Sequence, residues 1–324
     1  MNTPVRMSGT EGTAPTITII GAGAIGTLLA AILEKGGHRP TLIDRSRARA
    51  EERSRHGIMI KSANSCRLVK IPVAATPAEC AKAEIVFICV KAYDTAAAAA
   101  ILPQITTETS IIVSLQNGIG NAEIIDQYAP GRTLCAITSM GADIENNRTT
   151  RQTGDGLTAL APFGSTPIRH AETVAAILKT CDCTISVRTD TESMLWSKLI
   201  INAAINPVTA IHRITNGELL HHPALHTAKA IAQECAAVAQ AANIKLPYSD
   251  PVEAFMDICR KTAANRSSML RDIINGRKTE INAINGAIIK LADSLNLPAP
   301  ENSRVLSKIT KLSPFPRTDR TSKA

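Results

Sequence analysis

Short apolar runs, rich in isoleucine, valine and other strand-forming residues, divide the first half of the chain. Such runs predict buried strands, and the segments between them with apolar residues at helical spacing predict helices. The strands expected in one sheet are 16–20, 41–43, 84–90, 110–115, 133–140, 156–161 and 183–187, extended by shorter strands at 58–61 and 68–73. The expected helices are 27–35, an alanine-rich helix after Asp94, and 165–180, with Gly141-Ala142 at a turn. This alternation is typical of an α/β fold with a doubly wound, mainly parallel sheet.

From Thr189 onward the apolar spacing is helical almost throughout. The expected helices are an opening helix through 196–207, then 222–242, and a pair around 250–274 and 278–295 that Gly276 separates. We therefore expect a sheet domain at 16–188 and an all-helical domain at 189–312, with the boundary near 187–191. The polar extension 1–15 and the basic tail 313–324 are expected to be disordered.

Composition narrows the class of protein. The chain has 324 residues, of which 44% are hydrophobic, so two sizeable cores are possible. No apolar run long enough to span a membrane and no signal-peptide core are found, so we expect a soluble, cytoplasmic protein without membrane contact. The eight cysteines lack paired metal-ligand spacing, which predicts reduced thiols and no metal. The net charge of +8 is spread along the chain and few aromatics could stack on bases, so we expect no nucleic-acid partner.

A glycine-rich turn follows the first strand. Gly21-Ala22-Gly23-Ala24-Ile25-Gly26 has the spacing G-x-G-x-x-G and leads into the helix at 27–35. The first glycine allows a tight turn, the second lets a pyrophosphate approach the backbone, and the third lets helix and strand pack closely. The helix N-terminus adds amide donors. This motif in this setting predicts a Rossmann-type dinucleotide-binding domain.

The second strand ends in Asp44-Arg45, where cofactor choice is usually decided. An acidic residue at this place binds the ribose hydroxyls of NAD, whereas Arg45 or Arg47 could bind the 2′-phosphate of NADP. Whichever of Asp44 and Arg45 points inward should decide between NADPH and NADH. These charges could also only solvate a loop and a helix. Lys91 and Asn117 follow two later strands, at the sheet edge where ligands bind.

Lys198, Asn202 and Asn206 fall at i, i+4 and i+8 on an otherwise apolar helix, so their side chains line one stripe. Buried polar groups need partners, and an ammonium with two amides suits a small anionic ligand rich in oxygen. The alternative is a solvent-facing stripe on a surface helix. A lysine in such a place can protonate an alkoxide formed by hydride addition, because burial lowers its pKa.

Seven ordered motifs together resemble the ketopantoate reductases (2-dehydropantoate 2-reductases) from about Thr16 to Lys311. They are the glycine motif, Lys91-Ala92, Gln116-Asn117-Gly118, the stripe from Trp196 to Ala210, Asn216-Gly217-Glu218-Leu219, Ser267-Ser268-Met269-Leu270 and Thr279 to Gly286. The resemblance implies reduction of 2-dehydropantoate to (R)-pantoate with NADPH, on the route to pantothenate and coenzyme A. A reductase of another branched 2-keto acid and a non-catalytic NAD(P) sensor stay open as alternatives, as does a homodimer.

The resemblance also assigns roles to residues. It implies Lys198 as proton donor. A nearby Glu280 would raise the pKa of Lys198, so we expect the two residues to form a coupled catalytic pair in which Glu280 holds Lys198 or the ribose. The alternative is a surface ion pair of Glu280 with Lys278 or Arg277. The implied cofactor contacts are Gly21, Ala22, Gly23, Ala24, Ile25, Gly26, Arg45, Lys91, Asn117, Ala142 and Glu280. The implied substrate contacts are Asn117, Lys198, Asn202, Asn206, Asn216, Gly217, Glu218, Leu219 and Ser268. Ser267 or Ser268 could instead cap a helix. The family commonly has an apolar residue in place of Asp44, which keeps NADH open as the cofactor.

Overall fold

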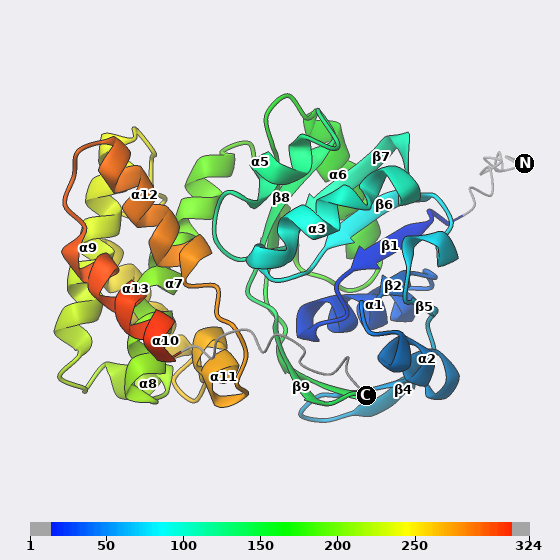
Figure 1. Ribbon diagram of the computed structural model, residues 1–324, viewed down its shortest axis with the longest axis horizontal. Coiled ribbons are helices and arrows are strands. Elements are labelled where there is room, and N and C mark those ends of the chain that lie inside the picture. The colour runs from blue at the N-terminus through cyan, green and yellow to red at the C-terminus, as the bar shows by residue number, and fades with distance from the viewer. Residues whose placement is uncertain (1–13, 313–324) are drawn as a thin grey trace, which may run out of the picture.

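The computed structural model describes residues 14–312, which form a sheet-based unit beside a unit made of helices (Figure 1). The predicted disorder of the basic tail 313–324, and of residues 1–13 in the N-terminal extension, concerns residues outside those that the structure describes. The central sheet has eight strands, and neighbouring strands are parallel except at the β8/β11 pair. Their spatial order is β12 (Ile185–Val187), β11 (Thr158–Pro162), β8 (Thr133–Thr138), β7 (Thr106–Ser114), β6 (Ala83–Ile88), β1 (Ile17–Ile20), β2 (Thr41–Ile43) and β5 (Val73–Ala74).

Helices cover both faces of this sheet, which confirms the predicted doubly wound architecture. One buried cluster joins the sheet to α1 (Ala24–Lys35) and α6 (Ile168–Lys179). Another joins it to α3 (Thr95–Ala100), α4 (Leu102–Ile105) and α5 (Asn121–Asp126). All four β1 residues are buried, as expected for a parallel strand covered on both sides.

A second, four-stranded sheet was not predicted. It has the order β4 (Cys66–Val69), β3 (Ile58–Lys61), β10 (Thr149–Gly154) and β9 (Gly141–Asn146). The prediction that 58–61 and 68–73 extend the main sheet is therefore wrong for 58–61 and for 68–69, whereas Val73 lies in β5 at the edge of the main sheet. The turn predicted at Gly141-Ala142 is also wrong, because β9 begins there. The β9 strand is only half buried, so it lacks the alternation that reveals a strand in sequence. Further short elements of this unit are α2 (Arg47–His56), η1 (Pro77–Glu79) and η2 (Ala92–Asp94).

The helical unit is built around α7 (Thr191–His212), whose buried residues form one cluster with the surrounding helices. These are α8 (Asn216–Leu219), α9 (Leu225–Ala241), α10 (Pro251–Lys261), α11 (Ser268–Ile274), the π-helical turn η3 (Asn282–Gly286), α12 (Ala287–Ser294) and α13 (Pro300–Leu312). The expected helix at 250–274 is thus two helices, and α13 was not predicted. The two largest clusters at this junction lie on either side of residue 188, and a small third cluster joins Met194 of α7 to the sheet unit, so the boundary near residue 188 stays a proposal.

Pro207 lies inside α7 and removes one helical N–H. The carbonyl of Ala203, which that N–H would have reached, instead accepts a hydrogen bond from Asn285 Nδ2 at 3.2 Å. Asn285 is fully buried in η3, so the motif after Glu280 closes a gap in the central helix. By length and composition α7 could cross a membrane, but 67% of its most apolar window is buried inside the protein, as in a core helix.

Candidate active site between the sheet and the helical unit

The glycine motif forms an open cradle at the N-terminus of α1. Gly21 has φ +111°, and a Cβ there would come within 2.8 Å of the Val90 nitrogen. A Cβ on Gly26 would collide with the Gly21 carbonyl, whereas a Cβ on Gly23 would meet no atom within 4 Å. Gly23 is also the N-cap of α1 and offers no side-chain cap, so the first amides of the helix are not capped by it. The open space at Gly23 is what the predicted approach of a pyrophosphate requires, and that contact stays a prediction.

Asp44 points inward and Arg45 outward. The Asp44 side chain is 0% exposed and bonds to the guanidinium groups of Arg49 and Arg53, whereas the Arg45 side chain is 83% exposed. Arg45 Nη1 lies 3.4 Å from Asp94 Oδ2. One alternative was that these charges only solvate a loop and a helix. For Asp44 this alternative is wrong, because Asp44 is part of a buried ionic cluster with Arg49 and Arg53.

Lys91, Asn117 and Glu280 come together although the chain separates them widely. Lys91 Nζ donates to Glu280 Oε2 at 3.1 Å, Asn117 Nδ2 donates to the same oxygen at 3.3 Å, and the Ala92 N–H donates to Oε1 at 3.0 Å. Glu280 is 6% exposed, so the alternative of a surface pair with Lys278 or Arg277 is wrong. Lys278 instead lies over the Tyr93 ring, 4.6 Å from its centroid.

Asp272 completes this cluster and was missed by the sequence reasoning. Its Oδ2 accepts from Lys91 Nζ at 2.7 Å, and the residue is 6% exposed. Burial raises the pKa of the Asp272 carboxyl, and Lys91 opposes that shift. Burial alone would lower the pKa of Lys91, but the carboxylates of Glu280 and Asp272 outweigh it and raise that pKa. Lys91 is thus a firmly protonated cation that joins the sheet unit to α11.

Lys198 reaches from α7 to the main sheet. Its Nζ donates to the carbonyl of Thr138, the last residue of β8, at 2.8 Å. Burial lowers the pKa of Lys198 to about 8, while the charge of Glu280 acts in the opposite direction. No hydrogen bond or ion pair joins Lys198 to Glu280 among the described residues, so the expected coupling of the pair is through space. The lysine is poised to lose or hold a proton near neutral pH.

The stripe beyond Lys198 carries free amides. Asn206 is 6% exposed and Asn202 is partly buried, and within residues 14–312 neither side chain has a hydrogen-bond partner. Ser267 is the N-cap of α11: its Oγ accepts from the Leu270 N–H at 3.2 Å and bonds to Thr209 Oγ1 at 2.8 Å. Ser268 is exposed and has no such bond in the described part of the chain. Asn202, Asn206 and Ser268 are therefore available to a ligand, and Ser267 has the capping role.

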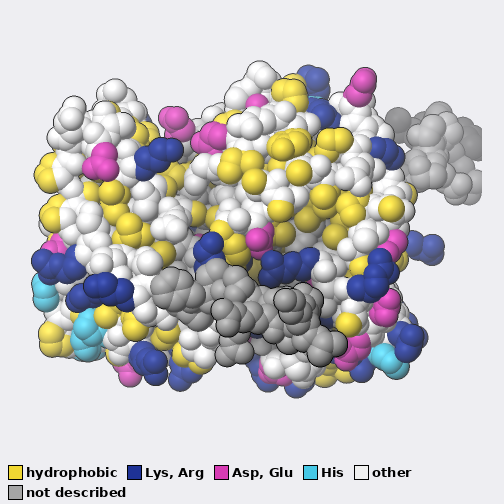
Figure 2. Space-filling view, in the orientation of Figure 1, with side chains coloured by type: hydrophobic (Ala, Val, Ile, Leu, Met, Phe, Trp, Pro, Cys, Tyr) yellow, Lys and Arg dark blue, Asp and Glu magenta, His cyan; other side chains and the backbone are white. Residues whose placement is uncertain are grey.

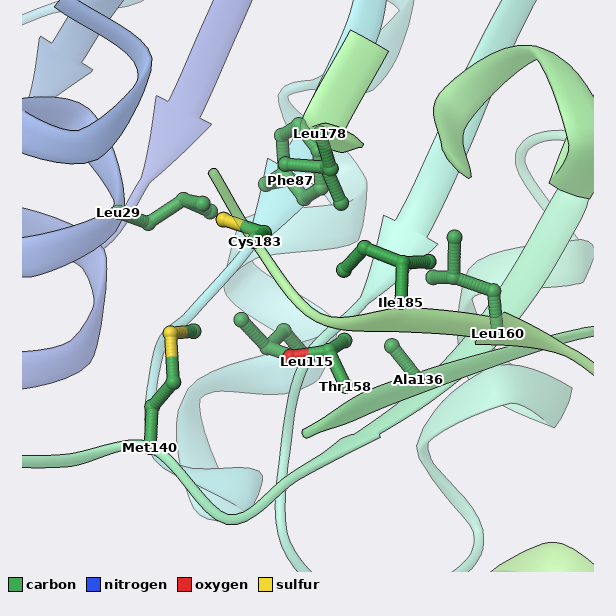
Figure 3. A pocket seen from close by; sticks show the side chains of 10 residues that line it. All are labelled: Leu29, Phe87, Leu115, Ala136, Met140, Thr158, Leu160, Leu178, Cys183 and Ile185. Carbon is green, nitrogen blue, oxygen red and sulfur yellow. The ribbon is translucent and has the colours of Figure 1, made fainter. Parts of the chain in front are cut away.

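The enclosed cavity in the sheet unit is not this site. Figure 3 shows that its lining comes from strands and helices of the sheet's core, including Leu29, Phe87 and Leu160. Its volume is about 10 Å³, and its lining has no charged side chain. A void of this size with apolar walls stays dry. On the face shown in Figure 2, the basic side chains are spread over both units and form no single patch.

Comparison with known proteins identifies the family. Residues 17–165 match the family model "Ketopantoate reductase PanE/ApbA", and residues 190–313 match its C-terminal counterpart, "Ketopantoate reductase PanE/ApbA C terminal". A 2-dehydropantoate 2-reductase from Archaeoglobus fulgidus is 32% identical over 295 residues, 90% of this chain and 96% of the relative. One from Pyrococcus horikoshii is 33% identical over 287 residues, 88% of this chain and 93% of the relative. The chain belongs to the ketopantoate reductase family.

Solved structures agree with this ketopantoate reductase fold. A PanE/ApbA family ketopantoate reductase from Ralstonia eutropha has a TM-score of 0.84 at 26% identity, with 92% of this chain and 98% of that chain covered. A D-mandelate dehydrogenase, solved with NADH and anilino(oxo)acetate, has a TM-score of 0.87 at 21% identity, covering 92% and 98% of the two chains. The second likeness shows the fold alone. The predicted recognition and fold class are thus confirmed, and the family is one of oxidoreductases.

The segment from Asn216 to Leu219, expected from the family resemblance to contact substrate, is held by contacts within the protein. Glu218 forms a capping box with Thr215, and Leu219 is 0% exposed in the helical core. A Cβ on Gly217 would come within 2.7 Å of the Ala263 Cβ. Asn216 Nδ2 donates to Thr262 Oγ1 at 2.8 Å, but its Oδ1 is buried without a partner. These contacts favour structural roles for Gly217, Glu218 and Leu219 and leave one free acceptor on Asn216.

Ala142 lies on β9 and contacts the helical unit through its backbone. Its carbonyl accepts from Arg271 Nη1 at 3.5 Å, and Arg271 also pairs with Asp143. Arg271 and Asp272 are therefore neighbours on α11 that reach two different parts of the sheet unit. Neither residue had a periodic signal in the sequence, and a charged pair just after Met269-Leu270 was the one available hint.

Proposed function

We propose that this ketopantoate reductase family member reduces 2-dehydropantoate to (R)-pantoate with NADPH, in the cytoplasm, on the route to pantothenate and coenzyme A. The observation that carries the proposal is Lys198. It is a lysine with a pKa lowered to about 8 by burial, held against Thr138, and followed on the same helix face by two unengaged amides. That combination suits a small oxyacid whose keto oxygen must receive a proton.

Lys198 acts as the general acid. When bound, the reduced nicotinamide supplies the hydride that adds to the 2-keto carbon. The Lys198 ammonium then gives one proton to the oxygen on that carbon, so an alcohol forms and the lysine becomes neutral. Burial favours the neutral amine, which helps the transfer. The Thr138 carbonyl holds one Nζ–H and so orients the ammonium.

The neutral donors position the substrate. The amides of Asn202 and Asn206 can bond the keto and hydroxyl oxygens, and the exposed Ser268 hydroxyl is a further free donor. Asn216 Oδ1, by contrast, is a buried acceptor without a partner. The Asn117 Nδ2 donates to Glu280, which leaves the side-chain oxygen Oδ1 of Asn117 to a ligand. Since a site that hydrogen-bonds a substrate hydroxyl discriminates against analogues that lack this group, these amides support selection of a hydroxylated keto acid.

The cofactor contacts extend over the glycine cradle, Arg45, Lys91, Asn117, Ala142 and Glu280. The open space over Gly23 fits the pyrophosphate, and the exposed Arg45 can reach a 2′-phosphate. Asp44 has its oxygens bonded to Arg49, Arg53 and the Ser46 N–H, so it offers little to ribose hydroxyls. The inward orientation of Asp44 would by itself select NADH, but because Arg49 and Arg53 pair with this carboxylate, the environment favours NADPH over NADH.

The proposal is tested by initial rates of nicotinamide oxidation with 2-dehydropantoate and with other branched 2-keto acids, each with NADPH and NADH. The highest kcat/KM is expected for 2-dehydropantoate with NADPH. A higher value for an acid without the hydroxyl group would support the other keto-acid reductase, and binding without turnover would support a sensor. We also propose a homodimer, which sedimentation of the purified protein would test.

A further inference from the structure

Asp44 is charged, buried and placed where a dinucleotide's adenosine ribose is usually recognised. It follows β2 by one residue and lies 23 positions after Gly21, close to the spacing of the ribose-binding acid in this fold. Its side chain is 0% exposed. A free carboxylate at this place would bind the ribose hydroxyls of NADH and repel the 2′-phosphate of NADPH.

Arg49 occupies both oxygens of that carboxylate. Its Nε donates to Asp44 Oδ2 at 2.5 Å, and its Nη2 donates to Oδ1 at 2.5 Å, in a two-point fork. The hydrogen bond to Asp44 is the main reason that the pKa of Arg49 is raised. The Arg49 side chain is still 35% exposed, so its outer edge faces solvent next to Asp44, the residue at the place where this fold binds the ribose.

Arg53 contacts the same Asp44 carboxylate from the protein interior. It lies four residues after Arg49 on α2, so the two side chains share a face of that helix. Its buried Nη1 lies 3.5 Å from Asp44 Oδ2 and donates to the Ala22 carbonyl of the glycine motif at 2.9 Å, and its Nε donates to the Asn147 carbonyl at 2.6 Å. Arg53 therefore anchors the cluster to the cradle, and Arg49 is its outer, accessible member.

We infer that Arg49 determines cofactor specificity by masking Asp44, and that this masking is what lets an acidic residue stand in an NADPH site. Arg49 withdraws the acceptors that NADH would use and leaves positive charge beside the 2′ position. Arg49 is a positioning residue with respect to Asp44, and the inference rests on the proposed function for its choice of NADPH.

The test compares NADPH and NADH binding to the full-length protein without substrate, by the fluorescence of the reduced nicotinamide. In Arg49→Gln each Asp44 oxygen loses its Arg49 donor and keeps one weaker contact, Oδ1 with the Ser46 N–H and Oδ2 with Arg53, so both oxygens regain acceptor capacity. We expect the ratio of Kd for NADH to Kd for NADPH to fall at least about tenfold, with NADPH binding weaker and NADH binding stronger. In the double variant with Asp44→Asn, most of that fall should be recovered, because the unmasked charge is gone.

Arg55→Gln is the matched control. Arg55 is exposed on the same helix and has no ion pair among residues 14–312, so its loss removes the same charge without touching Asp44. If Arg49→Gln does not fold, Arg49→Lys replaces it, and a smaller fall of the ratio is expected because lysine cannot hold both oxygens. An equal loss of both affinities, or an equal effect of Arg55→Gln, would overturn the inference. Failure of wild-type turnover with 2-dehydropantoate would refute the proposed function and leave the binding ratio as an independent result.

Discussion

Replacing Lys198 by alanine removes the ammonium that we propose as the proton donor. The substitution also breaks the hydrogen bond to the Thr138 carbonyl, but it leaves the glycine cradle and the Lys91–Glu280 cluster intact. Cofactor binding should therefore change little. General acid catalysis by a positioned side chain contributes about 10² to 10⁴ in rate, so kcat should fall by that factor.

The pH dependence of kcat/KM gives a second, independent test of the proton donor. With a pKa of about 8, Lys198 is roughly nine-tenths protonated at about pH 7 and roughly one-tenth protonated at about pH 9. Reduction needs the protonated form, so kcat/KM for the keto acid should fall as the pH rises through about 8. An ordinary lysine, with a pKa near 10.5, would keep the rate nearly constant over that range.

The assay is the initial rate of NADPH oxidation at saturating cofactor over this pH range, for wild type and Lys198→Ala. Fluorescence binding of NADPH to both proteins serves as the control for folding. The variant should lose the inflection near pH 8 together with its rate, and a small primary amine in the buffer should restore part of the rate. Full turnover in the alanine variant, or an unchanged inflection in it, would refute the assignment.

Three further perturbations follow from the same contacts. Because the folded-state pKa of Lys198 lies below 10.5, its charge destabilises the fold below about pH 8, and this cost fades as the pH rises to 10.5. The free energy of unfolding of Lys198→Met, measured with denaturant, should therefore exceed that of the wild type by about 1 to 3 kcal/mol at neutral pH. A variant less stable than the wild type would contradict this. In Glu280→Gln the charge that raises the pKa of Lys198 is gone, so the inflection of kcat/KM should move below pH 8; a shift upward would exclude that coupling. Gly23→Val should fold normally, as shown by circular dichroism, yet lose NADPH binding at least about tenfold, and retained affinity would place the pyrophosphate elsewhere.

Patterns within a few neighbouring residues predicted those elements whose conformation depends mainly on neighbouring residues. The strand, glycine turn and α1 were recognisable because apolar runs, φ-permissive glycines and helix spacing lie within a few residues of one another. The stripe of Lys198, Asn202 and Asn206 was found for the same reason. Helix α13 had apolar residues at Val305 and Ile309, at helical spacing, but its short stripe lies just before the basic tail and was not separated from it.

Contacts between distant segments left no such signal. Lys91 is separated by 181 residues from Asp272 and by 189 from Glu280, and no local pattern pairs these residues. Only the family resemblance placed Lys91 and Glu280 at one cofactor, and it did not include Asp272. The second sheet pairs β3 with β10, which are far apart in the chain, and most residues of β10 are not fully buried. The orientation of Asp44 likewise depends on Arg49 and Arg53, whose spacing on α2 was visible but whose target was not.

The most direct test of the central claim is the rate of NADPH oxidation when 2-dehydropantoate is added to the purified protein, with (R)-pantoate identified as the product. Rapid turnover that yields equal amounts of NADP and (R)-pantoate is the predicted result. Oxidation with another 2-keto acid alone, or cofactor binding without any oxidation, would contradict it.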